Sequence, residues 1–384
     1  MEVKKLKECC TIIAGQSPES KYYNSNGDGL PFFQGKADFG ELYPSIRVYC
    51  SQPTKIAEKD DILLSVRAPV GPTNLAPCKV CIGRGLTAIR PSEVLLTRYV
   101  LLFFRYFEAQ LASKGTGTTF KAITQDVVKN LEIPIPHLPE QERIVARIEE
   151  LFSQLDAGVE TLKKTKAQLA VYRQAVLKEA FGSVYGTECK IDDVCKEIKV
   201  GIVIKPTQYY VSSDGVFAFR NANVRRGYID DCDWVMISKE GHEKNRKSEV
   251  HTGDVLISRS GANLGMASPV SKRFDGYNAI DVVIAVPNTE KIIPAYLAHY
   301  TNSPMGRSIV KKNERGAAQG HLNVSAYGRL PIAVPSLNYQ QAIVDIIDGK
   351  MSVCDSIEQT VDAALQQAEA MRQSILKQAF GGAL

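Results

Sequence analysis

A stretch of 42 residues occurs twice in this chain, and it constrains the fold more strongly than any other feature of the sequence. Gln141–Gly182 aligns without a gap with Gln340–Gly381, and 15 of the 42 positions are identical. The identities include Asp156 with Asp355, and both copies end in Ala-Phe-Gly. An internal repeat of this size indicates that the chain contains two copies of one structural unit.

Each copy of the repeat is predicted to form one long helix. Pro139 suits the first helical turn, where its missing N–H is not needed, and Glu140 suits the positive end of the helix dipole. Apolar residues recur at alternating spacings of four and three over 144–176 and 343–375, which is typical of a coiled coil. We therefore predict that the two helices pair. They should run antiparallel, because a two-fold axis is the simplest relation between two repeats. Two ordinary core helices are the alternative interpretation.

Composition indicates a globular protein of the reducing cytosol. Apolar residues make up 44% of the 384 positions and charged residues 23%, and no run approaches the ~20 apolar residues that span a membrane. The first residues do not resemble a secretory signal. Nine cysteines without a regular framework fit a cytoplasmic location. The lone Cys78-x-x-Cys81 motif lacks the second ligand pair of a zinc site, so we predict no metal there.

The repeat divides the chain into four segments. Short strand-like runs bounded by turn residues predict a mixed fold before each helix, and Tyr99–Leu111 reads as a buried helix. The second globular segment repeats this plan with looser identity, and Pro294–Tyr300 takes the place of the buried helix. We predict an α+β protein in which two globular mixed α/β domains alternate with two long helices, related by pseudo-two-fold symmetry. The predicted boundaries are 1–138, 139–182, 183–336 and 337–384.

The positive charge of the chain lies in its globular segments. Residues 1–139 carry 17 Lys and Arg against 13 Asp and Glu, and residues 183–336 carry 20 against 16, so each segment has a net charge of +4. The first helix is neutral and the last segment carries −3. An excess of this size fits a polyanionic partner, although it is common on solvated surfaces.

The motifs of the common enzyme classes are missing from the sequence. Neither the dinucleotide fingerprint G-x-G-x-x-G nor the P-loop G-x-x-x-x-G-K-[ST] occurs. There is no Asn-Pro-Pro-aromatic motif and no glycine-rich adenosylmethionine fingerprint, so a methyltransferase is not supported. The five histidines show no metal-ligand spacing, and no carboxylate cluster of a nuclease is evident. We predict a non-enzymatic chain with no cofactor of its own.

The junctions of the repeat resemble those of one protein family. Ile133-Pro-Ile-Pro136 followed by Glu140-Gln141-Glu142, together with the duplicated Ala-Phe-Gly ends, resembles the specificity subunit of a type I restriction–modification enzyme. The resemblance covers essentially the whole chain. It implies that each globular segment is a target recognition domain for one half of a split, asymmetric site in double-stranded DNA. It also implies that the helices set the gap and dock two methyltransferase (modification) subunits, which use S-adenosylmethionine, with restriction subunits added in the full complex.

Candidate DNA-binding residues are those whose side chains match base edges or phosphates. Arg and Lys suit guanine, Asn and Gln suit adenine, and hydroxyl groups and lysines hold phosphates. The stretch from Arg220 to Arg226 is the densest cluster of base-reading chemistry. For any single residue, an ordinary solvated or turn role is an equally good interpretation. The first-domain candidates are Gln34, Lys36, Arg67, Arg84, Lys114, Thr116, Thr118, Thr119 and Lys121; the second-domain candidates are Arg220, Asn221, Asn223, Arg225, Arg226, Arg259, Asn263, Arg273, Arg315, Gln319, His321 and Asn323.

Two other classes of function remain open at this stage. A coiled-coil scaffold protein would lack salt-sensitive, sequence-dependent DNA binding. A free-standing enzyme with an unrecognised motif would methylate or cleave DNA as the purified chain alone.

Overall fold

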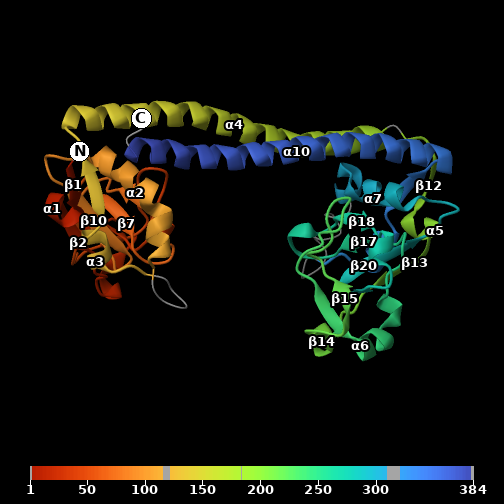
Figure 1. The fold of residues 1–384 in the computed structure, drawn as a ribbon. Helices are drawn as coiled ribbons and strands as arrows, with labels where there is room; N and C mark the ends of the chain where they lie inside the picture. Colours follow the sequence, from red (N-terminus) through yellow and green to blue (C-terminus); the bar gives the residue numbers. More distant parts are fainter. Residues whose placement is uncertain (1, 116–121, 183, 309–320, 382–384) are drawn as a thin grey trace. The chain divides into compact units, whose positions relative to one another are not determined.

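The protein is described by a computed structural model covering residues 2–115, 122–182, 184–308 and 321–381. It divides into two compact units. The first comprises residues 1–162 and 362–384, and the second comprises residues 163–361. Each unit thus holds one globular domain, the start of one long helix and the end of the other. Figure 1 shows each domain with its own sheets and helices.

Domain 1 is built from short strands in three sheets. Their orders are β1-β11, β2-β10-β7-β8 and β3-β5-β4-β9-β6. Among the described strands of domain 1, only β4 and β9 pair in parallel. The elements are β1 (Glu2–Lys5), α1 (Leu6–Cys9), β2 (Cys10–Ala14), β3 (Tyr23–Asn24), β4 (Leu30–Phe33), β5 (Tyr49–Cys50), β6 (Ile56–Ala57), β7 (Ile62–Ser65), β8 (Thr73–Leu75), β9 (Val80–Ile82), β10 (Leu86–Pro91), α2 (Thr97–Ser113), α3 (Gln125–Lys129) and β11 (Glu132–Ile135).

Domain 2 repeats this topology in its own residues, except that its third sheet has four described strands and no counterpart of β6. Its sheets have the orders β12-β21, β13-β20-β17-β18 and β14-β16-β15-β19, and β15 and β19 form the parallel pair. The predicted repetition of the domain plan is therefore present in the strand order. The elements are β12 (Thr187–Lys190), α5 (Ile191–Val194), β13 (Cys195–Val200), β14 (Tyr210–Val211), β15 (Gly215–Phe219), β16 (Val235–Ser238), α6 (Lys239–Lys244), β17 (Val255–Ser258), β18 (Ala267–Pro269), β19 (Asn278–Ala279), β20 (Val282–Pro287), α7 (Pro294–Asn302), α9 (Val324–Gly328) and β21 (Pro331–Val334).

The two long helices are α4 (Leu138–Gly182) and α10 (Leu337–Phe380). Both predicted helices are confirmed, and α4 begins one residue earlier than expected, so that Pro139 lies in its first turn. Several positions of the predicted seam are buried, among them Ile148, Leu169 and Val361. Tyr172 and its equivalent Met371 are instead about half exposed. A helix of 3.6 residues per turn drifts by about 20° per heptad from a strict seven-residue repeat, so seam positions turn toward solvent wherever the helices do not supercoil enough to follow the repeat.

The identical ends of the two helices dock into the domains. Phe380, at the end of α10, packs on Tyr99 of α2 with ring centroids 5.2 Å apart. In the second unit, Phe181 packs on Tyr296 of α7 at the same 5.2 Å. The two tyrosines are themselves equivalent, since each donates a hydrogen bond to a carbonyl of the extended strand before a long helix. Each Ala-Phe-Gly end thus inserts an aromatic side chain into a domain core.

The starts of the helices are anchored by two equivalent glutamines. Gln141 accepts a hydrogen bond from the N–H of Leu96 at 2.9 Å and donates to the carbonyls of Val94 and Pro136, both at 2.8 Å. Gln340 makes the same three bonds in the second unit, and neither glutamine is exposed. A buried amide that satisfies three backbone groups fixes where the helix meets its domain.

Candidate nucleic-acid interface

Four of the predicted first-domain residues line a single concavity, which we call the strand-end hollow. Gln34, Lys36, Arg67 and Arg84 surround it, and its volume is about 210 Å³. Each of the four follows or precedes a strand: β4 leads to Gln34, β7 leads to Arg67, and Arg84 lies between β9 and β10. The remaining lining residues are Ser17, Gly35, Ser65, Ala68 and Gly85.

Backbone contacts hold the loops around the strand-end hollow close together. The N–H of Gly83 donates to Phe33 O at 2.8 Å, and the N–H of Val66 donates to Gly85 O at 2.9 Å. A Cβ on Gly85 would lie 2.2 Å from Gln34 O, so this approach requires glycine. Ser65 donates its hydroxyl to Arg67 O at 3.1 Å, which fixes the backbone that carries the arginine.

The cations of the strand-end hollow have no carboxylate partner among the described residues. Lys36, Arg67 and Arg84 are exposed and form no ion pair there. The nearby carboxylate of Asp38 accepts from the N–H of Gln34 and is paired with Arg47 at 2.6 Å. The hollow therefore presents exposed cations that form no direct ion pair among the described residues, next to an exposed amide, as a surface that binds an anion or the acceptor edge of a base does.

The asparagines of the predicted second-domain cluster are engaged inside the protein. Asn223 is 1% exposed, donates to Cys232 O at 2.9 Å and accepts from the N–H of Arg220 at 2.9 Å. Asn221 accepts from the N–H of Arg259 at 2.7 Å and donates to Ser260 Oγ at 2.9 Å. In this structure both side chains brace loops and are not available as base readers.

Most arginines predicted to bind DNA in the second domain face an aspartate. The pair Arg220–Asp233 has a distance of 2.8 Å, Arg225–Asp230 has 2.9 Å and Arg259–Asp281 has 2.9 Å. Arg273 is paired with Asp231 and lies over the ring of Phe274. These guanidinium groups would have to leave their carboxylates to contact DNA, so the sequence prediction for them stays a prediction.

The other predicted residues are scattered. Arg226 is exposed, and Lys114 is exposed at the end of α2. Asn263 donates to Asn221 O at 3.0 Å, and Asn323 caps α9 by accepting from the N–H of Ser325. His321 is partly buried, and its Nδ1 has no hydrogen-bond partner within the described part of the chain. Thr116, Thr118, Thr119, Lys121, Arg315 and Gln319 lie outside the described residues.

Sequence reasoning missed three residues near these surfaces. Ser17 lines the strand-end hollow and accepts from the N–H of Arg84 at 3.2 Å. Burial raises the pKa of Tyr23, and Gln34 and Arg84 beside it act in the opposite direction. Burial lowers the pKa of Arg307, and the charge of Arg226 lowers it further. No motif marks these positions, because each depends on loops that are distant in sequence.

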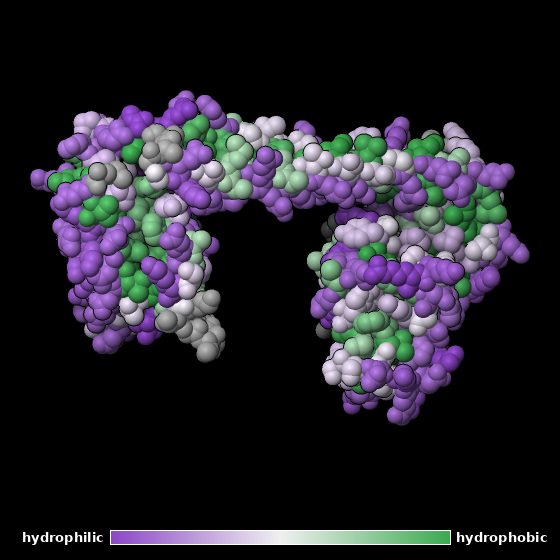
Figure 2. All heavy atoms as spheres, in the orientation of Figure 1, coloured by the Kyte–Doolittle hydropathy of each residue, from purple (hydrophilic) through white to green (hydrophobic). Residues whose placement is uncertain are grey.

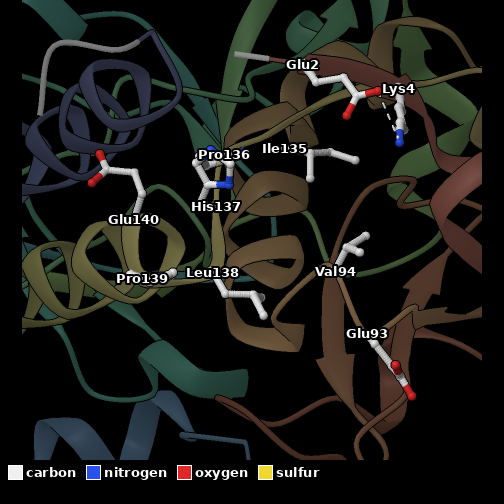
Figure 3. Close-up of a pocket in the computed structure, with 10 residues that line it drawn as sticks. All are labelled: Glu2, Lys4, Glu93, Val94, Ile135, Pro136, His137, Leu138, Pro139 and Glu140. Atoms are coloured by element: carbon white, nitrogen blue, oxygen red, sulfur yellow. Dashed lines mark ion pairs between the residues drawn. The ribbon is translucent and has the colours of Figure 1, made fainter.

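A second, larger hollow lies in the first unit where α4 begins, and we call it the helix-start hollow. Its volume is about 880 Å³. Figure 3 shows Val94, Ile135 and Leu138 around it and the ion pair between Glu2 and Lys4 at its margin. Leu138 is 40% exposed and Val94 50% exposed. The hollow also includes Glu93, Pro136, His137, Pro139 and Glu140.

The visible surface of both units is mainly hydrophilic, as Figure 2 shows. Exposed apolar side chains nevertheless occur on the long helices, including Val171 on α4 and Ile346 and Val353 on α10. None of the described helices is long and apolar enough to cross a membrane. Across the described ranges, no group of three or more His, Cys, Asp or Glu is placed to hold a metal ion.

Comparison with known proteins gives consistent matches. The sequence pattern of the family described as "Type I restriction modification DNA specificity domain" matches residues 1–170 and again residues 187–367. The "Putative type I restriction enzyme MjaX specificity subunit" of Methanocaldococcus jannaschii is 40% identical over 43% of this chain and 38% of that protein. The "Type I restriction enzyme EcoBI specificity subunit" of Escherichia coli is 25% identical over 76% of this chain and 67% of that protein.

Among solved structures, the HsdS subunit from Thermoanaerobacter tengcongensis is 48% identical to this chain, with a TM-score of 0.38. The match covers 41% of this chain and 38% of that one. The chain thus spans less than half the length of two of these three relatives and about two thirds of the third.

Proposed function

Since the chain belongs to the family of type I restriction–modification DNA specificity domains, we propose that it is the non-catalytic DNA-recognition subunit of such a complex. Each globular domain reads one half of a bipartite, asymmetric site in double-stranded DNA. The observation that carries the proposal is that the family pattern matches twice, once over each copy of the repeat. A repeated recognition domain in one chain is suited to a target with two separate halves.

The surfaces of the two domains support reading of two different halves. Domain 1 presents unpaired cations and an exposed amide at the strand-end hollow. At the corresponding strand ends of domain 2, the chain places Asn221, Arg259 and Asp281 in a closed hydrogen-bond network. Two domains with one topology and different chemistry at the same place favour an asymmetric target.

We further propose that α4 and α10 form an antiparallel coiled coil with pseudo-two-fold symmetry, which sets the gap between the two half-sites. Reciprocal ion pairs support this arrangement. In the second unit, Arg173 of α4 binds Asp355 of α10, and in the first unit Arg372 of α10 binds Asp156 of α4. In a two-fold arrangement, each residue of one copy contacts the same partner position in the other copy, as these two ion pairs do.

The proposed partners are two methyltransferase subunits, which would use S-adenosylmethionine, and restriction subunits in the full complex. The chain itself then needs no cofactor, and its place of action is the cytoplasm. Docking at the starts of α4 and α10 would give two similar sites per chain. The helix-start hollow supports one of them, since it combines exposed apolar side chains with a polar margin, the usual composition of an interface.

The test is to express the chain with a type I methyltransferase subunit and map the methylated positions in DNA. The proposal expects one interrupted sequence with two specific halves. It also expects that the chain alone neither methylates nor cleaves DNA. Salt-independent binding, or a complex without sequence preference, would instead favour a coiled-coil scaffold without DNA specificity.

A further inference from the structure

We propose that the strand-end hollow reads a guanine-containing half-site, with Arg67 and Arg84 as the guanine readers and Gln34 on an adjacent base. This inference rests on the proposed function and deepens it, because it names the chemistry of one half of the target. It assigns the specificity of domain 1 to three side chains that come from three separate loops.

The geometry of the hollow suits recognition of a base edge. Arg67 and Arg84 lie on loops that backbone hydrogen bonds join through Val66 and Gly85. The glycine at position 85 lets the loop of Gln34 come within contact distance of the loop of Arg84. Two planar donors and one amide therefore surround a single concavity. A guanidinium fork matches the O6 and N7 acceptors of guanine, and an amide matches adenine.

The charges in domain 1 separate the reading arginines from the structural ones. Arg90 donates to Asp61 at 2.7 Å, and Asp61 is almost fully buried, so that arginine holds the domain together. Arg47 is paired with Asp38. Arg67 and Arg84 have no carboxylate partner among the described residues, although they are exposed. A guanidinium group that is held in a built hollow without a counter-charge is available for an acceptor on a ligand.

The amide of Gln34 favours a base over a phosphate as the ligand. The NH2 group of an amide can donate to a phosphate oxygen, but its carbonyl oxygen is an acceptor and finds a partner only on a ligand that also offers a donor. A base pair in the major groove offers donors and acceptors side by side. Gln34 is exposed at the margin of the same hollow, so one base step can engage the amide and an arginine together.

At the corresponding place in domain 2, the described residues are paired with one another. There Arg259 donates to Asp281 at 2.9 Å, and Asn221 is held by Ser260 and by the N–H of Arg259. Asp281 thus accepts from the arginine of domain 2, as we propose that guanine accepts from the arginines of domain 1. The guanine-reading chemistry should therefore belong to one half-site only.

The experiment uses the complex of the full chain with its methyltransferase subunits and a library of duplexes randomised in both half-sites. Arg67→Ala and Arg84→Ala should each relax discrimination at one G·C position of a single half, by about 5- to 150-fold. The other half and the gap should stay unchanged. Lys59→Ala removes an exposed positive charge elsewhere in domain 1, and it should leave the selected sequence as it is.

Arg84→Lys separates base reading from phosphate binding. Lysine keeps the charge, so the salt dependence of binding should stay unchanged. It loses the planar fork, so discrimination at the G·C position should weaken, although less than for Ala, because lysine also binds guanine. A uniform loss over all sequences with a shallower salt dependence in Arg84→Ala would assign the hollow to phosphate and overturn the inference. Unchanged selection by all variants would also overturn it. If the complex of the unsubstituted chain selects no bipartite site, the proposed function itself fails. That result differs from a failure of the guanine inference alone, in which the unsubstituted chain still selects a bipartite site.

Discussion

Arg173 of α4 lies 2.5 Å from Asp355 of α10, measured from Nη2 to Oδ1, and the same arginine contacts Glu358 at 2.8 Å. The equivalent residues of the other copy, Arg372 and Asp156, form the same pair in the first unit. All four positions are identical between the two copies of the repeat. The identities in the middle of the repeat thus include side chains that join one helix to the other.

These pairs predict a specific energetic coupling. A double-mutant cycle on Arg173→Ala and Asp355→Ala should give a coupling of about 0.2–1 kcal/mol, because the pair is partly exposed. Amide hydrogen exchange in the second half of α4 reports the opening free energy locally. The matched control pairs Arg173→Ala with Asp156→Ala, which lies in the other unit and should show no coupling. Equal coupling in both cycles would contradict the specific pairing.

The buried glutamines predict a larger effect at the helix starts. Gln141→Leu removes the partner of three backbone groups, so it should lower the stability of the first unit by about 2–4 kcal/mol. Gln340→Leu should do the same in the second unit. Hydrogen exchange resolved by peptide should show increased exchange in the unit that carries the change. Gln168→Leu, at an exposed position of α4, is the control and should change stability by less than about 0.5 kcal/mol.

The sequence predicted the long helices and the repetition of the domains because both leave a local signal. A seven-residue apolar pattern and a shared register can be seen without any tertiary contact. The identities Gln141/Gln340 and Phe181/Phe380 could be aligned, yet their partners could not be found. Those partners, such as Leu96 and Tyr296, lie in segments that diverged between the copies.

The candidate interface could be predicted only in part, because the sequence does not show which charged side chains pair with each other. In domain 1, residues chosen by type, some of them also by their place after an expected strand, do line one hollow; Arg67 and Arg84 are two of them. In domain 2 the same reasoning selected Asn223, which is buried, and Arg225, which is paired with Asp230. Residue type gives the chemistry a side chain can perform, while the fold decides which carboxylate or carbonyl it meets first.

The helix starts give a prediction about partner binding. Leu138 and Leu337 are equivalent first residues of α4 and α10, and they are 40% and 36% exposed. Aspartate at either position should be tolerated, since a carboxylate is favourable at a helix N-terminus. We expect Leu138→Asp or Leu337→Asp to leave one bound methyltransferase subunit, and the double variant to leave none. Native mass spectrometry of the co-expressed complex gives the count.

The control for this docking prediction is Ile204→Asp, which changes an exposed apolar residue of domain 2 in the segment that follows β13. It should leave two bound subunits. A double variant that still binds two subunits would place the docking sites elsewhere on the helices.

The long helices should also act as a spacer, and their length can be changed without disturbing the seam. One added heptad in each helix, inserted after Lys164 and after the equivalent Ala363, keeps the seven-residue spacing of the apolar positions. Seven residues lengthen a helix by about 10.5 Å. At 3.4 Å per base pair, that distance corresponds to about three base pairs of B-DNA, or fewer if the helices are inclined to the DNA axis. We expect a target with unchanged half-sites and a gap longer by one to three unspecified base pairs.

The methylated positions in DNA exposed to the lengthened complex show the gap directly. A heptad inserted in α4 alone is the control, since it should misalign the helix pair and abolish methylation. An active complex that carries both insertions and keeps the original gap would mean that the helices do not set the spacing.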